Sequence, residues 1–68
     1  MMTKFPEILK DIRLENNISR QELADAILVS VRTISYWESG QRECNLDQLT
    51  LLSKFFHVTT DFLLGLEE

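Results

Sequence analysis

The sequence contains few of the residues that tight turns, cross-links and membrane spans require. Two Gly and one Pro in 68 residues are too few for an all-β domain with many tight turns. Cys44 is the single cysteine, so an internal disulfide is excluded, which fits a reducing cytoplasm. No apolar run approaches the ~20 residues of a membrane-spanning helix, and the N-terminus has no signal-peptide pattern. We therefore expect one small helical domain over residues 1–68.

The charge is unevenly distributed along the chain. The formal net charge is −4, which by itself argues against nucleic acid as a partner. Residues 1–42 carry equal numbers of basic and acidic side chains, and the excess of acid lies in residues 43–68. A basic surface built from the first part of the chain is therefore compatible with the acidic total.

Apolar spacing predicts a compact all-α bundle of five short helices. The first helix carries a stripe at i, i+3, i+4 and i+7, formed by Phe5, Ile8, Leu9 and Ile12. Thr3 is its expected cap, and two consecutive Asn residues end it.

Two capped helices follow at close spacing. Ser19 and Glu22 form a capping box at the start of the second helix. Ser30 offers the next N-cap, and Gly40 ends the third helix. The pair, about 19–39, is separated by only about three residues, which is the arrangement of a helix-turn-helix.

The fourth and fifth helices are expected in the last third of the chain. Asn45 and Gln48 form an amide variant of the capping box, and the fourth helix extends to about His57. We expect that helix to be largely buried because it is rich in apolar residues: Leu46, Leu49, Leu51, Leu52, Phe55 and Phe56. Thr59 or Thr60 starts the last helix, and Gly65 ends it.

The third helix has two faces of different character. At 3.6 residues per turn, Ile34 and Trp37 fall on one side, which predicts that they belong to the core. The opposite side carries Val31, Arg32, Ser35 and Tyr36. Arg pairs with guanine, apolar groups pack on thymine methyls, and hydroxyls bond base edges or phosphates. A surface helix without a partner carries similar residues, so it is the capped helix pair that favours DNA binding.

The segment ISRQELADAILVSVRTISYWESGQRECNLDQLTLLSKFF resembles the helix-turn-helix of the Cro/C1 (XRE) family of phage and bacterial repressors. The matching positions keep the family's order and spacing and include Ile18-Ser19, Glu22-Leu23-Ala24, Val29-Ser30, Thr33-Ile34-Ser35, Trp37-Glu38, Gly40 and Arg42. The resemblance extends from about Leu9 to Gly65 and implies a lambda-repressor-like fold. It also implies a sequence-specific DNA-binding transcriptional regulator, a repressor of phage or mobile-element type, in the bacterial cytoplasm.

The resemblance assigns DNA contacts to two groups of residues. Base contacts are expected from a recognition helix at about 31–38, namely from Val31, Arg32, Thr33, Ser35 and Tyr36. Phosphate contacts are expected on either side of it, from Arg20, Gln21, Ser30, Ser39, Gln41 and Arg42. The family's structural ion pair corresponds to Arg13 and Glu38, and this pairing removes Glu38 from the charge of the DNA-facing surface.

Three positions depart from the family pattern. The turn position that commonly has Gly with positive φ is Leu28, so either this residue is strained or the turn is remodelled. The Gln at the start of the second helix is Arg20, a cation that can neutralise phosphate directly. The Pro after the third helix is Cys44, which loosens the entry into the fourth helix.

The apolar C-terminal segment is expected partly to close the core. By resemblance it also forms a homodimer interface, with Phe62, Leu63 and Leu66 as candidates, so the implied partners are a double-stranded DNA operator and a second copy of the chain. No enzyme activity, cofactor, metal, membrane or small-molecule ligand is expected. The alternative is a protein-interaction or antitoxin-like module that keeps the fold without operator binding, which the net acidity and Leu28 favour.

Overall fold

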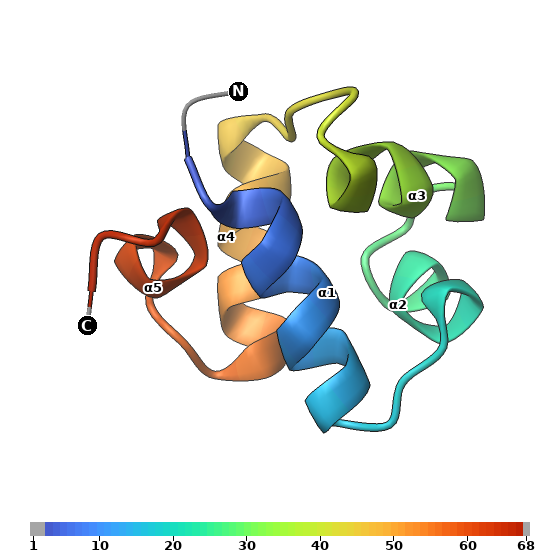
Figure 1. Ribbon diagram of the computed structural model, residues 1–68. Helices are drawn as coiled ribbons and strands as arrows, with labels where there is room; N and C mark the ends of the chain where they lie inside the picture. Colours follow the sequence, from blue (N-terminus) through green and yellow to red (C-terminus); the bar gives the residue numbers. More distant parts are fainter. Residues whose placement is uncertain (1–2, 68) are drawn as a thin grey trace.

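Residues 3–67 are described by the computed structural model and form five short α-helices (Figure 1). Their order is α1 (Phe5–Glu15), α2 (Arg20–Ala26), α3 (Val31–Ser39), α4 (Leu46–Phe56) and α5 (Thr60–Leu64). No strand occurs between residues 3 and 67, so the prediction of an all-α, five-helix fold is confirmed. None of the helices in this range has the length and apolar character needed to cross a membrane.

Side-chain caps set the start of α2, α3, α4 and α5. In each case the residue before the helix accepts a hydrogen bond from the backbone N–H three positions later, at 2.7 to 3.1 Å. The capping residues are Ser19, Ser30, Asn45 and Thr59. The boxes that begin α2 and α4 are complete, because Glu22 and Gln48 each bond back to the N–H of the cap.

The start of α1 differs slightly from its prediction. Lys4 is the N-cap residue and makes no side-chain cap. The hydroxyl of Thr3, one position earlier, accepts a hydrogen bond from the N–H of Phe5 at 3.3 Å. Thr3 therefore accepts a hydrogen bond from the first turn of the helix, although it lies one position before the N-cap.

Every helix is followed by a residue in the left-handed region of the backbone. Gly40 and Gly65 follow α3 and α5, each with φ of +79°. Asn17 and His57 follow α1 and α4, and both types adopt positive φ more readily than most side chains do. Leu28 follows α2 at φ of +62°, and it is the one aliphatic residue among these five.

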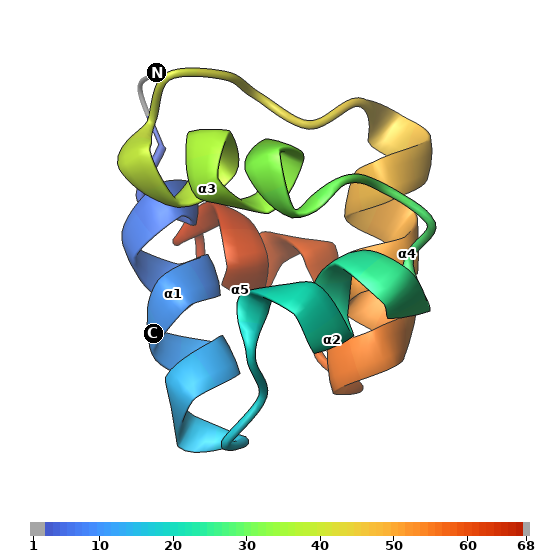
Figure 2. The same ribbon diagram turned by 90° about the vertical axis from the view of Figure 1, so that its right-hand side faces the viewer.

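Helix α3 is central to the packing of the bundle. It contacts both α1 and α2, while α5 contacts both α1 and α4. Figure 2 looks toward α2 and α3, with α1 and α4 at either side. The buried core lies between the helices and consists of Phe5, Leu9, Leu23, Ala24, Ile27, Ile34, Trp37, Leu49, Leu52 and Leu63.

Helix α4 is less buried than its composition predicts. Leu49 and Leu52 are buried, but Leu46 is 81% exposed. Leu51 and Phe55 are also exposed, at 44% and 37%. The expectation of a largely buried helix is therefore wrong. Its main helical neighbour is α5, so only one stripe of α4 meets the core and its other apolar side chains face outward.

Candidate nucleic-acid interface

The turn between α2 and α3 keeps the conformation that the family pattern requires. The N–H of Val29 donates to the carbonyl of Ala24 at 3.0 Å and closes the turn. Leu28 supplies the left-handed residue, with φ of +62°, and its side chain is 89% exposed. Of the two alternatives for Leu28, the structure supports strain, because the turn is not remodelled and no burial of the side chain compensates.

The two predicted faces of α3 are present. Ile34 and Trp37 are 0% and 2% exposed, and the Trp37 ring packs edge-on against Phe5 with ring centroids 6.4 Å apart. On the opposite face Val31 is 41% exposed, and Arg32 and Ser35 are exposed as well. Core packing thus fixes one side of α3 and leaves the other side accessible.

Two hydroxyl groups at the start of α3 bond to each other. The Oγ atom of Ser30 lies 2.9 Å from Oγ1 of Thr33 and also accepts the N–H of Thr33. Thr33 is only half-exposed. Its hydroxyl is therefore partly engaged by the helix cap, whereas nearby Ser35 is exposed.

The ion pair implied for Arg13 and Glu38 is present. Nε of Arg13 lies 2.7 Å from Oε2 of Glu38, and Nη2 lies 3.1 Å from Oε1. Nη1 of Arg13 donates to the carbonyl of Ile18 at 2.9 Å. One buried guanidinium thereby joins α1, the loop that enters α2, and the last turn of α3.

Arg20 also contacts Glu38, a pairing that the sequence did not suggest. Nε of Arg20 lies 3.2 Å from Oε1 of Glu38, and the Arg20 side chain is 45% exposed. Glu38 therefore forms ion pairs with two arginines, one buried and one at the surface. Arg13, Arg20 and Glu38 sum to one positive charge, and Glu22 in the first turn of α2 offsets it.

Gln21 is engaged on the surface of its own helix. Its Nε2 donates to Oδ1 of Asp25 at 2.8 Å, one turn further along α2. The amide has a second N–H to donate, but the Asp25 carboxylate beside it repels phosphate, so Arg20 is the better placed of the two neighbours.

The loop after α3 folds back on the last turn of that helix. The carbonyl of Tyr36 accepts the N–H of Gln41 at 3.0 Å and the N–H of Arg42 at 3.4 Å. It also accepts the hydroxyl of Ser39 at 3.2 Å. The guanidinium carbon of Arg42 lies 4.9 Å from the centroid of the Tyr36 ring. Ser39, Gln41 and Arg42 are all exposed, at the C-terminal end of the candidate recognition helix.

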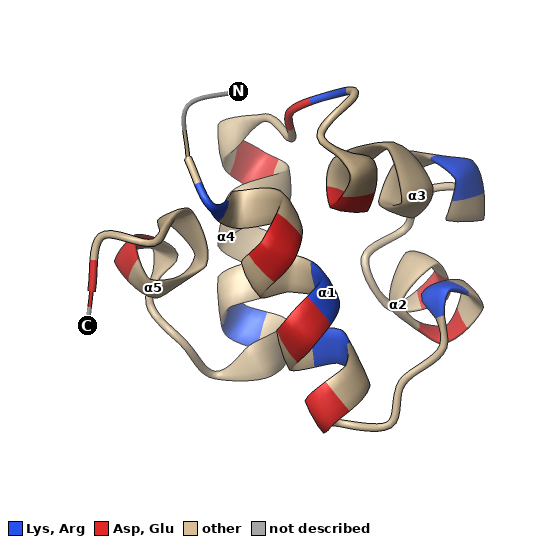
Figure 3. Cartoon of the chain, in the orientation of Figure 1, with Lys and Arg blue, Asp and Glu red and all other residues tan. Residues whose placement is uncertain are grey.

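Three arginines and several acidic residues share the side formed by α2, α3 and the loop after α3: Arg20, Arg32 and Arg42 with Glu22, Asp25, Glu38 and Glu43. Figure 3 shows basic residues at the first turns of α2 and α3, in the loop after α3, and on α1 and α4, and acidic residues on all five helices and in the same loop. Glu22 and Asp25 lie on α2 itself. The pKa of Glu22 is lowered, chiefly because its carboxylate accepts the backbone N–H of Ser19 and also through the Ser19 hydroxyl. Of the acidic residues in the C-terminal segment, Glu43 lies beside Arg42 in the loop after α3, whereas Asp47 and Asp61 lie on α4 and α5.

The candidate dimer residues on α5 and beyond fall into two classes. Phe62 and Leu66 are 37% and 71% exposed, as an interface requires. Leu63 is 0% exposed and belongs to the core. Its assignment to the dimer face is therefore corrected, because adjacent positions on a helix point in different directions and Leu63 takes the inward one.

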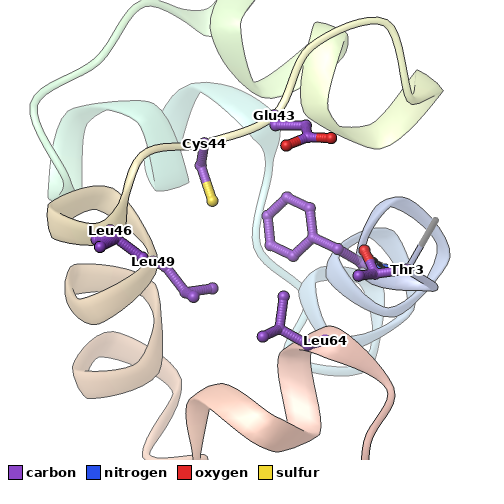
Figure 4. Close-up of a pocket in the computed structure, with 7 residues that line it drawn as sticks. Thr3, Glu43, Cys44, Leu46, Leu49 and Leu64 are labelled. Carbon is purple, nitrogen blue, oxygen red and sulfur yellow. Dashed lines mark hydrogen bonds between the residues drawn. The ribbon is translucent and has the colours of Figure 1, made fainter. Parts of the chain in front are cut away.

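A separate apolar cleft of about 310 Å³ lies away from α2 and α3 (Figure 4). It is lined by Thr3, Phe5, Glu43, Cys44, Leu46, Leu49 and Leu64. The Cys44 sulfur points into the cleft, and burial raises the pKa of its thiol. A thiol with a raised pKa is a poor nucleophile at neutral pH, so Cys44 acts here as a small apolar lining residue.

Comparison with known proteins places this geometry in a family. Residues 9–63 match a family model described as Helix-turn-helix. The HTH-type transcriptional activator BcrR of Enterococcus faecalis is 43% identical over 65 residues, which are 96% of this chain and 32% of that protein. The chain thus spans about a third of the length of this relative.

Two solved structures are similar over nearly all of the chain. The P22 c2 repressor, crystallised with a synthetic operator, has a TM-score of 0.87 at 30% identity, covering 93% of this chain and 96% of that one. A transcriptional regulator from Listeria innocua has a TM-score of 0.91 at 26% identity, covering 100% of this chain and 64% of that one.

These matches include the capped helix pair, the outward face of α3 and the helices that support them. The similar proteins described above are transcriptional regulators. The fold is lambda-repressor-like, as the resemblance implies. The chain therefore belongs to the Cro/C1-type (XRE) helix-turn-helix family.

Proposed function

We propose that this chain is the DNA-binding part of a sequence-specific transcriptional regulator, with α3 inserted in the major groove of its operator. The observation that carries the proposal is the division of α3 into a buried side at Ile34 and Trp37 and an accessible side at Val31, Arg32 and Ser35. A helix fixed to the core on one side presents base-reading groups in a defined direction.

The accessible residues have complementary chemistry for base edges. Arg32 offers two parallel N–H donors for the O6 and N7 atoms of guanine. Val31 offers an apolar surface for a thymine methyl, and Ser35 offers a hydroxyl for either kind of base. Thr33 contributes less, because its hydroxyl is bonded to the Ser30 cap.

Phosphate contacts are assigned to both sides of α3. Arg20 lies at the start of α2 and keeps its Nη groups available while Nε bonds Glu38. Arg42 lies in the loop after α3, beside exposed Ser39 and Gln41. Ser30 caps the N-terminus of α3, where the first backbone N–H groups attract anions. These groups clamp the DNA strands that border the major groove.

We further propose repression as the mode of regulation, acting in the bacterial cytoplasm. The support is the similarity to the P22 c2 repressor, whose structure was solved with an operator. BcrR, by contrast, is named as an activator. Whether such a protein represses or activates transcription also depends on where its operator lies relative to the promoter. It depends too on the part of BcrR that this chain does not match. A reporter gene with the operator overlapping its promoter tests this point, because repression lowers expression and activation raises it.

A homodimer that binds two half-sites fits the small size of the domain. Phe62 and Leu66 are exposed apolar side chains in and just after the last helix, and we assign them to the dimer interface. Two recognition helices in one dimer then meet half-sites about 34–36 Å apart, which raises affinity beyond that of a single domain.

Selection of bound duplexes from a random DNA pool tests the proposed function. We expect an enriched motif with two-fold symmetry, and binding that weakens steeply as the salt concentration rises. Replacing Lys54, a basic residue of α4 outside the proposed interface, by Ala is the matched control and leaves binding unchanged. If neither selected nor random duplex binds even at about 50 mM salt, the interaction-module alternative is correct instead.

A further inference from the structure

The side chains of Tyr36 and Arg42 stack on each other at the C-terminal end of α3. The guanidinium carbon of Arg42 lies 4.9 Å from the centroid of the Tyr36 ring. This separation falls within the range of about 6 Å in which a cation is attracted to the face of an aromatic ring. Arginine is well suited to the contact because its flat, delocalised guanidinium can lie on the ring and still donate from its edge.

The backbone places Arg42 independently of this stack. The Tyr36 carbonyl accepts the N–H groups of Gln41 and Arg42, at 3.0 and 3.4 Å. Gly40, with φ of +79°, permits the chain to reverse direction between Tyr36 and Gln41. Removing the ring of Tyr36 therefore leaves these backbone bonds possible and changes chiefly the direction of the Arg42 side chain.

We propose that Tyr36 is a positioning residue that aims the guanidinium of Arg42 at a DNA phosphate, and that it is not a base-reading residue. The inference rests on the proposed function and deepens it. A free arginine in an exposed loop loses side-chain entropy when it binds, and a stacked arginine has already lost part of it. The ring thus increases affinity for DNA without contributing to sequence discrimination.

This role separates Tyr36 from the other residues on the outward face of α3. Arg32 and Ser35 are exposed, whereas Tyr36 is half-buried and one face of its ring is occupied by Arg42. A contact that reads a base changes the ratio of affinities between sequences. A contact that positions a phosphate ligand changes all affinities by the same factor.

Binding by four variants tests the proposal: Tyr36→Phe, Tyr36→Leu, Arg42→Ala and the double variant Tyr36→Leu/Arg42→Ala. Each is titrated against a duplex selected from a random pool and against a random duplex. We expect Tyr36→Leu to weaken both complexes by the same factor, about two- to fivefold. Tyr36→Phe keeps the ring and retains wild-type affinity. In the Arg42→Ala background, Tyr36→Leu has no further effect, because the group that the ring positions is absent.

A second readout follows the stack in the free protein. Ring currents shift the Arg42 side-chain proton resonances upfield in the unaltered chain and in Tyr36→Phe, and the shift disappears in Tyr36→Leu. Thermal unfolding checks that Tyr36→Leu remains folded at the binding temperature, and the resonance comparison is made on the folded protein.

Three outcomes overturn the proposal. If Tyr36→Phe reduces the preference for the selected duplex, the hydroxyl reads a base. If Tyr36→Leu weakens binding equally with and without Arg42, the ring acts through some other group. If the unaltered chain binds no duplex while the upfield shift is present, the stack exists but the proposed function fails, and the role assigned to Tyr36 fails with it.

Discussion

The guanidinium of Arg13 holds the carboxylate of Glu38 at two points, with Nε 2.7 Å from Oε2 and Nη2 3.1 Å from Oε1. The two side chains are only 6% and 3% exposed. Arg13 comes from α1 and Glu38 from the last turn of α3, so the pair sets the orientation of the candidate recognition helix relative to the rest of the bundle. Arg20 adds a third charge to the same carboxylate, but at the surface.

Replacing Glu38 by Ala should lower the free energy of unfolding by about 3–5 kcal/mol, because it leaves the Arg13 charge buried without its partner. Replacing Arg20 by Ala, the control, should cost at most about 1 kcal/mol, since its side chain is 45% exposed and well solvated. Urea unfolding measures both values. Equal losses in the two variants would contradict the assignment of Arg13 as the structural partner.

Helix boundaries were predictable from the sequence because capping is a local property. Ser19, Ser30 and Asn45 each bond an N–H only three positions away, so a short window of sequence contains the whole interaction. The buried face of α3 was predictable for a similar reason. Ile34 and Trp37 are the large apolar residues on one side of a short amphipathic helix, which leaves a single orientation that buries them.

Burial and side-chain partners were harder to predict where several arrangements satisfy the same pattern. The apolar residues of helix α4 cover more than half of its circumference, and periodicity alone does not say which stripe meets the core. Leu63 and Leu66 are equally apolar, yet one is 0% and the other 71% exposed. The second arginine on Glu38 and the stack of Arg42 on Tyr36 depend on the rotamers of long side chains, which sequence spacing does not define.

Replacing Leu28 by Gly should stabilise the fold by about 0.5–1 kcal/mol, because relief of a left-handed conformation exceeds the added flexibility of the unfolded chain. Leu28 has φ of +62° and is 89% exposed, so little packing is lost. Thermal and urea unfolding provide the measurement. Leu28→Ala keeps the Cβ atom and should bring no such gain. If Ala stabilises as much as Gly, the exposed apolar side chain, and not the backbone, is the source of the cost.

The capping box of α2 should make stability depend on pH. Hydrogen bonds from the Ser19 N–H and hydroxyl lower the pKa of Glu22 in the folded chain. A lowered pKa gives stability that is present above the unfolded value of about 4.3 and is lost as pH falls through the folded value. Glu22→Gln replaces the carboxylate by an amide, the group with which Gln48 completes the capping box of α4. The variant therefore keeps a capping box but loses the dependence of stability on pH.

Urea unfolding of the unaltered chain and of Glu22→Gln, from neutral pH down to about pH 2, provides the comparison. The stability advantage of the unaltered chain over the variant should shrink as the solution is acidified. Parallel curves throughout that range would mean that the Glu22 carboxylate makes no charge-dependent contribution to the helix start.

The exposed apolar side chains of Phe62 and Leu66 should mediate self-association. Leu66→Arg introduces a charge at a position that is 71% exposed, so it should weaken dimerisation by about tenfold or more while the monomer remains folded. Leu46→Arg alters a leucine that is 81% exposed on α4 and should leave dimerisation unchanged. Sedimentation equilibrium measures both. A monomeric unaltered chain, or equal effects of the two variants, would contradict a dimer built on Phe62 and Leu66.

Arg32, on the outward face of α3, and Arg42, in the loop after α3, should affect DNA binding in different ways. Arg32→Ala removes a base contact, so affinity for the selected duplex should fall by about 1–3 kcal/mol and the preference for one base pair in each half-site should relax. Arg42→Ala removes a phosphate contact, so all duplexes should bind more weakly by a similar factor, with a salt dependence shallower by about one ion per protomer. Fluorescence anisotropy over a salt series, with Lys54→Ala as control, separates the two patterns. If Arg32→Ala instead weakens all sequences alike, α3 does not enter the major groove in the orientation proposed here.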